Sequence, residues 1–219
     1  MVREEIENGI KDLEPWFHFM LLDGVPTKGK AISGEGLNYP SQLFSPISKF
    51  FTKEFFEKKR CLDIGCNSGF FSFEMARLGA DVLGVDNDQW HKAIGQAEFA
   101  NKVFGLEDVD FKRCDFMDME CDQEFDVVLF LGVYYHLQEP EKALAKIASM
   151  MKQGGVLFLE TAYGVEPERY GDTGKVYNSD PTNFLVPSKD GINREIVEAG
   201  FDITEVLQYN RHFVKAVKR

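Results

Sequence analysis

The sequence lacks the features that mark a secreted, membrane-spanning or nucleic-acid-binding chain. It has only four cysteines, none in a C-x-x-C pair, so the reduced thiols of a cytoplasmic protein are expected. No apolar run approaches the ~20 residues that cross a bilayer, and the first residues show no signal-peptide pattern. Basic residues are the minority, 25 against 36 acidic ones, which disfavours nucleic acids and anionic membranes as partners.

Histidines and cysteines, the usual zinc ligands, are also sparse. The four histidines are scattered, and no cysteine and histidine stand at ligand spacing, so no metal site is expected. What the chain does have is an ordinary globular balance, with 44% hydrophobic and 28% charged residues among 219. This length suits one good-sized domain with a single core.

Short apolar runs alternate with helical segments from residue 60 onward. Strands are expected at 61–64, 81–85, 109–113, 126–131, 155–159, 201–207 and 210–217, and helices at about 69–78, 89–104, 139–151 and 188–199. Alternating strands and helices predict an α/β fold whose parallel sheet is covered on both faces.

The residues before this alternation predict a separate N-terminal helical arm and lid, residues 1–59. Residues 1–14 read as a helix, and residues 16–40 are rich in glycine, proline and aromatics, which is typical of a binding loop or lid. Residues 41–58 show apolar positions at helical spacing. The main domain is expected over 60–219, with an insert at about 162–187.

The most informative segment is a glycine-rich turn between an expected strand and the next helix. Residues 61–70 read CLDIGCNSGF, so Asp63 lies near the strand end and Gly65 and Gly69 lie in the turn. Gly65 permits a tight turn and a close approach of a ligand, and the start of the helix offers unpaired N–H groups. This arrangement predicts a ligand-binding loop.

Acidic residues follow the next two expected strands. Asp86 ends the second strand, where a carboxylate can accept both ribose hydroxyls of a nucleoside. Asp115 and Phe116 follow the third, where an acceptor and an aromatic ring can hold an adenine. The turn lacks the G-x-G-x-x-G spacing of dinucleotide sites, and Asp63 suits a ligand with an ammonium group better than a pyrophosphate. The pattern therefore favours S-adenosylmethionine, although glycine turns and strand-end acids occur in many α/β folds.

These residues resemble the class I S-adenosylmethionine-dependent methyltransferases over residues 60–217. The resemblance implies a Rossmann-like, seven-stranded methyltransferase sheet with its last strand antiparallel and helices on both faces. Asn67 stands where many members have a central glycine, which tightens the turn. The resemblance and the strand ends together nominate the cofactor-binding residues Asp63, Gly65, Cys66, Asn67, Gly69, Asp86, Asn87, Asp115, Phe116, Leu131 and Gly132.

Polar side chains after the fourth and fifth strands are the candidates for the catalytic side. Tyr135, His136 and Glu160 are expected beyond the carboxyl ends of these strands, where the methyl acceptor should lie. The pKa of an ordinary histidine suits a general base, so His136 is the main candidate. It can equally contact cofactor or substrate without proton transfer, or only orient its loop, and Glu160 can simply cap a turn.

The segments 132–136 and 159–161, with the insert that precedes a helix at Pro187, resemble one branch of this family. That branch includes the enzyme that carboxymethylates the wobble uridine of transfer RNA with carboxy-S-adenosylmethionine. The basic residue that pairs with the extra carboxylate is expected near Phe17 and His18, and neither is a lysine. Plain S-adenosylmethionine is therefore the expected cofactor.

Two aromatic segments have open roles. The side chains of Trp16, Phe17, Phe19 and Tyr39 form either a lid over the cofactor or an arm that packs on the sheet. The insert at 162–186 is either a wall of the acceptor site or a surface excursion.

The sequence thus predicts a cytoplasmic methyltransferase that acts on an oxygen or nitrogen of a small or medium-sized metabolite. The first alternative is an enzyme that modifies a transfer RNA uridine, with the basic cluster at 49–60 in contact with phosphates. The same cluster also reads as a solvated helix face. The second alternative is a non-catalytic protein that binds S-adenosylmethionine.

Overall fold

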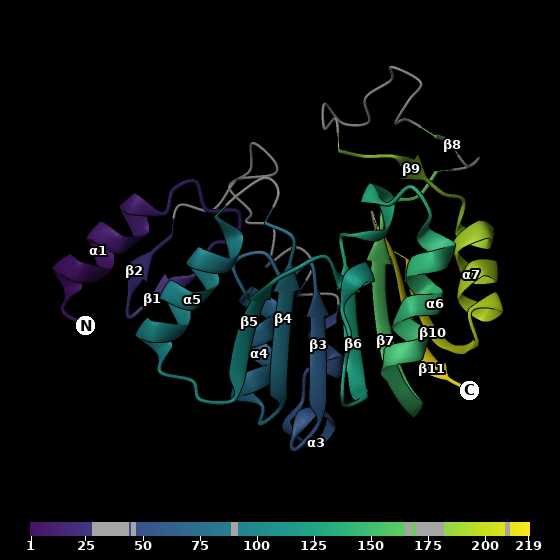
Figure 1. The fold of residues 1–219 in the computed structure, drawn as a ribbon, viewed down its shortest axis with the longest axis horizontal. Helices are drawn as coiled ribbons and strands as arrows, with labels where there is room; N and C mark the ends of the chain where they lie inside the picture. The colour runs from purple at the N-terminus through teal and green to yellow at the C-terminus, as the bar shows by residue number, and fades with distance from the viewer. Residues whose placement is uncertain (28–43, 45–46, 89–91, 165–167, 170–181, 209–210) are drawn as a thin grey trace. The chain divides into compact units, whose positions relative to one another are not determined.

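The computed structural model describes residues 1–27, 44, 47–88, 92–164, 168–169, 182–208 and 211–219 (Figure 1). The chain divides into two compact units, residues 1–119 and residues 120–219, and each is described by itself. The boundary predicted between residues 59 and 60, and the extent of the insert, stay predictions.

Seven strands form one mixed sheet in the order β10-β11-β7-β6-β3-β4-β5. The first unit holds β3 (Arg60–Ile64), β4 (Asp81–Asp86) and β5 (Val109–Arg113), and the second holds β6 (Phe125–Leu131), β7 (Met151–Thr161), β10 (Phe201–Gln208) and β11 (His212–Lys218). Strands β3, β4 and β5 are parallel, as are β6 and β7. Strand β11 is antiparallel to both β7 and β10. The predicted seven-stranded sheet with an antiparallel last strand is therefore confirmed.

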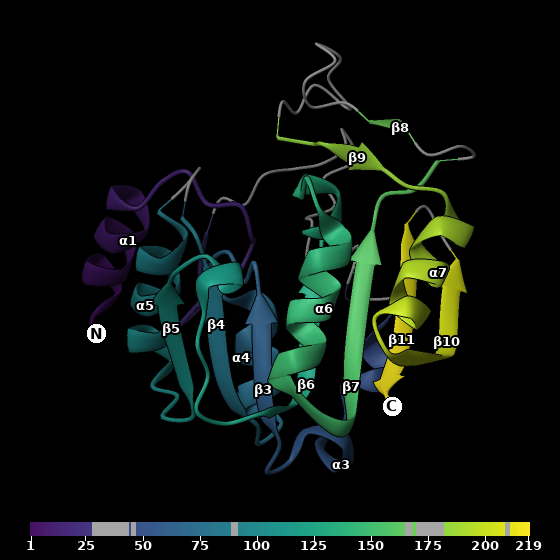
Figure 2. The ribbon, with the colours of Figure 1, turned by 45° about the vertical axis from the view of Figure 1, so that its right-hand side comes forward.

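Helices separate the parallel strands, as the alternating pattern predicts. The first unit contains α1 (Arg3–Asp12), α3 (Lys53–Phe56), α4 (Phe70–Arg77), α5 (Ala93–Phe104) and the 3-10 turns η1 (Ser48–Phe50) and η2 (Phe116–Asp118); the second contains η3 (Tyr134–His136), α6 (Pro140–Met150) and α7 (Lys189–Glu198). Two antiparallel pairs, β1 (Leu21–Leu22) with β2 (Val25–Pro26) and β8 (Glu168–Arg169) with β9 (Leu185–Val186), lie outside the main sheet. Figure 2 shows α7 packed against β10, and it shows β9 beyond the carboxyl end of β7.

Burial along the strands matches their place in the sheet. Every residue from Val127 to Leu131 in β6 is buried, as expected for a parallel strand covered on both faces. In the edge strand β5 only Val109 is buried, and charged residues fill much of the remainder. Charges on an edge strand oppose pairing with another chain.

The helical spacing predicted over residues 41–58 does not produce one helix. The described part contains η1 and the four-residue α3, separated at Phe51 and Thr52. Thr52 is extended and its side chain accepts a hydrogen bond from the Phe55 N–H, so it starts a new helix. The Phe51 ring packs 5.0 Å from the Phe56 ring, between centroids. A local cap and aromatic packing therefore override the periodicity.

Gly84 in β4 provides a test of the packing in the first unit. A Cβ atom at this position would lie 2.7 Å from Phe111 Cδ1 and 3.0 Å from Ser72 Oγ. We expect Gly84→Ala to lower the free energy of unfolding by about 1–3 kcal/mol because these side chains must move. Urea unfolding followed by circular dichroism measures the change.

Gly95→Ala in α5 is the matched control. Among the described residues, its Cβ would meet only Leu13 Cδ2, at 3.8 Å. Removal of a helical glycine should stabilise the protein by about 0.5–1 kcal/mol. Equal effects of the two variants would contradict the packing described for Gly84.

Candidate functional site

The glycine turn after β3 is tied to the end of β4 by main-chain hydrogen bonds. The N–H groups of Gly65 and Cys66 donate to the Val85 carbonyl, at 2.8 and 3.1 Å. The next N–H, that of Asn67, donates to Asp86 Oδ2 at 3.1 Å. Gly65 and Asn67 both have positive φ, +69° and +49°, which lets the chain reverse direction and enter α4. The structure thus brings the predicted turn and the predicted ribose acid together.

A second carboxylate lies beside Asp86. The Asp88 N–H donates to Asp86 Oδ1 at 2.8 Å, and Asp88 Oδ2 pairs with the Arg113 guanidinium at 2.5 Å. The other oxygen, Asp88 Oδ1, is buried and has no hydrogen-bond partner among the described residues. The sequence pointed to Asp86 and Asn87 but missed Asp88, whose only signal was its place in the turn after a strand-end acid. Asn87 itself is exposed.

Asp63 is the buried acid of the turn. Its carboxylate is 3% exposed and accepts a 2.6 Å hydrogen bond from Ser72 Oγ in α4. Burial raises the pKa of Asp63 to about 7, the Ser72 hydrogen bond opposes this shift, and the nearby Asp86 charge adds to it. A cationic group in this site would favour the ionised form.

The turn also contains two small buried side chains. The Cys66 thiol lies 3.6 Å from the Asn67 carbonyl, and burial raises its pKa, so it is a packed thiol rather than a nucleophile. Ser68 is fully buried, and its Oγ has no hydrogen-bond partner among the described residues. An orphaned hydroxyl in a ligand-binding turn fits a polar ligand that completes it. The sequence had not singled out Ser68.

The adenine side predicted after β5 has a defined local geometry. Asp115 Oδ1 accepts a hydrogen bond from the Met117 N–H at 2.9 Å and thereby starts η2. Phe116 is buried, at 6% exposure. The roles assigned to Asp115 and Phe116 stay predictions.

The described part of the N-terminal arm packs within the first unit. Trp16 is 2% exposed and donates its Nε1–H to the Ile10 carbonyl at 2.8 Å. The buried His18 ring packs edge-on against Phe70 and Phe71, at the start of α4, and burial lowers its pKa to about 3. Trp16 is therefore packed inside the arm, and the lid over the cofactor stays a prediction; Tyr39 lies outside the described residues.

In the second unit, Glu160 is the centre of a buried ion pair. Its carboxylate is 1% exposed and pairs with the Arg211 guanidinium, while its carbonyl accepts the Gly132 N–H at 3.0 Å. Burial raises the pKa of Glu160, and Arg211 opposes the shift. The same guanidinium lies over the Tyr135 ring, 4.7 Å from its centroid. Arg211 therefore links two of the three predicted catalytic residues, although the sequence did not identify it.

His136 contacts both Tyr135 and the segment before β9. Its ring centroid lies 4.3 Å from that of Tyr135. Its Nδ1 lies 2.9 Å from Thr182 Oγ1 and 3.0 Å from the Thr182 carbonyl oxygen. The structure thus groups Tyr135, His136 and, through Arg211, Glu160. Leu131 and Gly132, predicted to touch the cofactor, lie at the end of β6, and that role stays a prediction.

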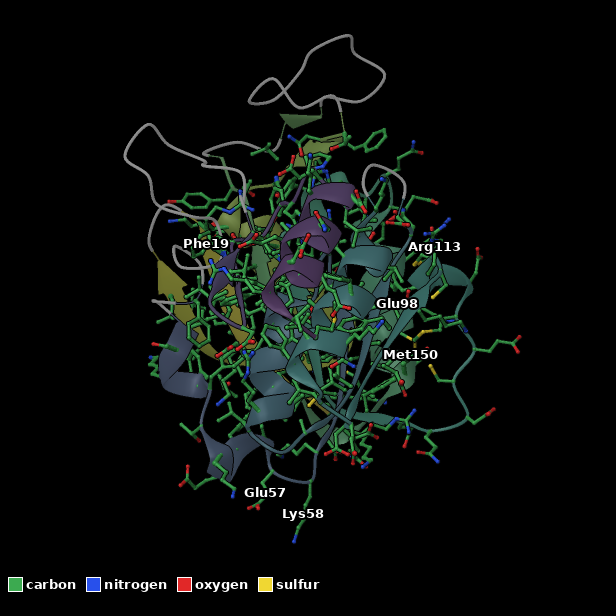
Figure 3. All side chains as sticks on the ribbon, turned by 90° about the vertical axis from the view of Figure 1, so that its left-hand side faces the viewer. Phe19, Glu57, Lys58, Glu98, Arg113 and Met150 are labelled. Atoms are coloured by element: carbon green, nitrogen blue, oxygen red, sulfur yellow. The ribbon has the colours of Figure 1, made fainter. Side chains whose placement is uncertain are left out.

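The basic cluster at 49–60 is partly engaged with neighbouring side chains. Lys53 lies 3.6 Å from Glu57, and Arg60 lies 3.9 Å from Asp81. Figure 3 shows Glu57 and Lys58 at the opposite end of the first unit from Phe19. Among the described residues, no group of three or more His, Cys, Asp or Glu side chains could hold a metal ion. In the same part of the chain, no helix is both long and apolar enough to span a bilayer.

Comparison with known proteins gives consistent matches. A family model described as "Methyltransferase domain" matches residues 55–209. A tRNA U34 carboxymethyltransferase from Campylobacter jejuni subsp. jejuni serotype O:23/36 (strain 81-176) is 31% identical over 172 residues, which cover 74% of this chain and 55% of the relative. A ubiquinone biosynthesis O-methyltransferase from Mesorhizobium japonicum is 34% identical over 107 residues, 48% of this chain and 42% of the relative. The chain thus spans about half the length of the curated relatives it matches.

A solved structure, the N-terminal domain of EvdMO1 with SAH bound, has a TM-score of 0.73 at 20% sequence identity. The match covers 100% of this chain and 97% of the other. At this identity the likeness concerns the fold.

The raised pKa of Asp63 predicts how stability depends on pH. Between about pH 4 and pH 7 the folded protein retains a proton that the unfolded chain releases, so this group's contribution to stability falls as pH rises and is lost above pH 7. We expect Asp63→Asn, which stays neutral and can still accept from Ser72, to be more stable than the ligand-free wild type at pH 8 by a few kcal/mol. Urea unfolding at pH 4 to 8 measures this.

Asp110→Asn, at an exposed position of β5, is the control and should follow the wild-type profile. If the free energy of unfolding of Asp63→Asn changed with pH in parallel with that of the wild type, the pKa of Asp63 would not be raised and the prediction would be wrong.

Proposed function

This chain belongs to the methyltransferase domain family, whose cofactor is S-adenosylmethionine, and we propose that it methylates an oxygen or nitrogen of a small or medium-sized metabolite. The observation that carries the proposal is the Asp86 carboxylate, held against the glycine turn by the Asn67 N–H. A strand-end carboxylate beside a helix N-terminus suits a nucleoside ligand. The proposal includes a cytoplasmic location, which the absence of disulfides among the four cysteines, all within the described residues, supports.

The residues of the turn fit S-adenosylmethionine. Asp86 would accept the ribose hydroxyls, Asp63 would lie on the side of the ammonium group, and the buried Ser68 hydroxyl would gain a partner. When bound, S-adenosylmethionine supplies an electrophilic methyl carbon attached to a positively charged sulfur. The chain's own task is to orient this methyl group and to exclude water.

We assign the acceptor side to Tyr135, His136 and Glu160. His136 acts as the general base that takes the proton of the acceptor O–H or N–H. Glu160 acts through its ion pair, because a carboxylate engaged with Arg211 is best suited to hold that guanidinium over Tyr135. Tyr135 would contact the acceptor through its hydroxyl or its ring.

A second candidate, modification of a transfer RNA uridine, draws on the tRNA U34 carboxymethyltransferase relatives. The basic residues at 49–60 are the phosphate contacts it would use, although two of them have acidic neighbours. The net charge of −11 opposes this candidate. The metabolite therefore remains the first proposal.

Cofactor binding is tested at the two ends of β4. Asp86→Asn removes one oxygen from the carboxylate, so we expect the Kd for SAH (S-adenosylhomocysteine) to rise by about 10- to 100-fold. Asp81→Asn, at the exposed start of the same strand, should bind as the wild type does. Isothermal titration calorimetry measures both constants, and wild-type affinity in Asp86→Asn would overturn this cofactor site.

The acceptor is tested with radiolabelled S-adenosylmethionine and fractionated cell extract. We expect label in a small-molecule fraction, and less of it with Asp86→Asn. Label in an RNA fraction that ribonuclease releases, together with RNA affinity that falls steeply with salt, would support the second candidate instead. Binding of SAH with no transfer to any fraction would favour the non-catalytic alternative.

A further inference from the structure

Two hydrogen-bonded contacts join the segment before β9 to the turn that carries His136. The Phe184 N–H donates to the Tyr135 carbonyl at 2.9 Å, and Thr182 lies against His136 Nδ1. Strand β9 contacts η3, and Figure 2 shows β9 beyond the end of β7. The position of the His136 ring therefore depends on residues that follow it by about fifty positions.

The nature of the Thr182 atoms determines which His136 nitrogen carries hydrogen. A carbonyl oxygen can only accept, so the 3.0 Å contact between it and Nδ1 requires an Nδ1–H donor. The Thr182 hydroxyl, at 2.9 Å from the same nitrogen, can accept from this N–H as a second partner. In the neutral ring the lone pair must then reside on Nε2.

We propose that Thr182 is a positioning residue that holds His136 in the Nδ1–H tautomer and so makes Nε2 the nitrogen that exchanges the proton. This rests on the proposed function of His136 as the general base. The acceptor's O–H or N–H bond breaks, its electron pair stays on the acceptor atom, and the proton forms a new bond with the Nε2 lone pair. The Nδ1–H remains on Thr182 throughout.

The position of Thr182 also gives the segment before β9 a role in the reaction. Thr182 is half-buried, and the residues that follow it are tied to the second unit by the Phe184 contact and by the Gly164 N–H, which donates to the Pro187 carbonyl at 2.9 Å. These bonds fix the Thr182 carbonyl relative to η3. The end of the predicted insert thus orients the base.

The first test is the tautomer itself, read from nitrogen NMR of the full chain labelled with ¹⁵N-histidine. The signals of His136 are identified by their loss in His136→Asn. We expect a protonated Nδ1 and an unprotonated Nε2 in the neutral ring, opposite to the preference of histidine in water. A protonated Nε2 in the wild type would overturn the proposal.

The second test removes the Thr182 hydroxyl. Thr182→Val keeps the main-chain carbonyl, so the Nδ1–H tautomer should persist, but the ring loses one of its two partners and kcat should fall by about 3- to 10-fold with KM unchanged, the effect of one lost hydrogen bond. Thr182→Ser should restore kcat. Thr204→Val is the control, because the Thr204 hydroxyl also bonds a main-chain carbonyl, that of Lys215, at an exposed position of β10. A wild-type kcat in Thr182→Val would overturn the positioning role of the side chain.

Two substitutions of His136 separate this inference from the proposed function. The amide nitrogen of His136→Asn can replace Nδ1 at Thr182 but offers nothing in place of Nε2, so kcat should fall by at least about 100-fold. Full activity in His136→Asn would overturn the base role whatever the tautomer. Loss of activity in this variant, combined with an Nε2–H tautomer in the wild type, would overturn only the role of Thr182.

Discussion

The hydrogen bonds between the turn after β3 and the end of β4 are the constraint that holds the proposed cofactor-binding residues together. The Val85 carbonyl accepts two successive N–H groups of the turn, and the Asp86 carboxylate takes the next. These bonds form because β3 and β4 are parallel neighbours whose register pairs Ile64 with Val85. A nucleoside that reaches the carboxylate therefore also meets the turn and the start of α4.

In the second unit, a buried ion pair orders the polar groups. A buried carboxylate such as Glu160 is unfavourable unless it is paired, and Arg211, the residue before β11, supplies that pairing. Since β11 pairs with β7 and places Phe213 opposite Glu160, strand register brings the neighbouring Arg211 close to the Glu160 carboxylate. Tyr135 and His136 are held in turn by Arg211 and Thr182, so contacts within the second unit orient both side chains.

Local sequence patterns were sufficient to predict much of the fold but less of the site. The strand predicted at 61–64 is observed at Arg60–Ile64, because a run of apolar residues between breakers has few alternatives. The prediction of a helix from the spacing at 41–58 was wrong, because apolar spacing contains no information about the cap at Thr52 or the packing of Phe51. The strand predicted at 155–159 is longer in the structure, where β7 runs from Met151 to Thr161 directly after α6.

The sequence by itself determined the order of strands and helices, the glycine turn and the acid at the end of β4, because each depends on residues close together in the chain. Only the tertiary structure decided what these side chains do to one another. Arg211 reaches Glu160 across 51 positions, and Thr182 reaches His136 across 46. Such contacts form because strand pairing and the turns of the chain bring residues together that are distant in the sequence, and no local periodicity encodes them.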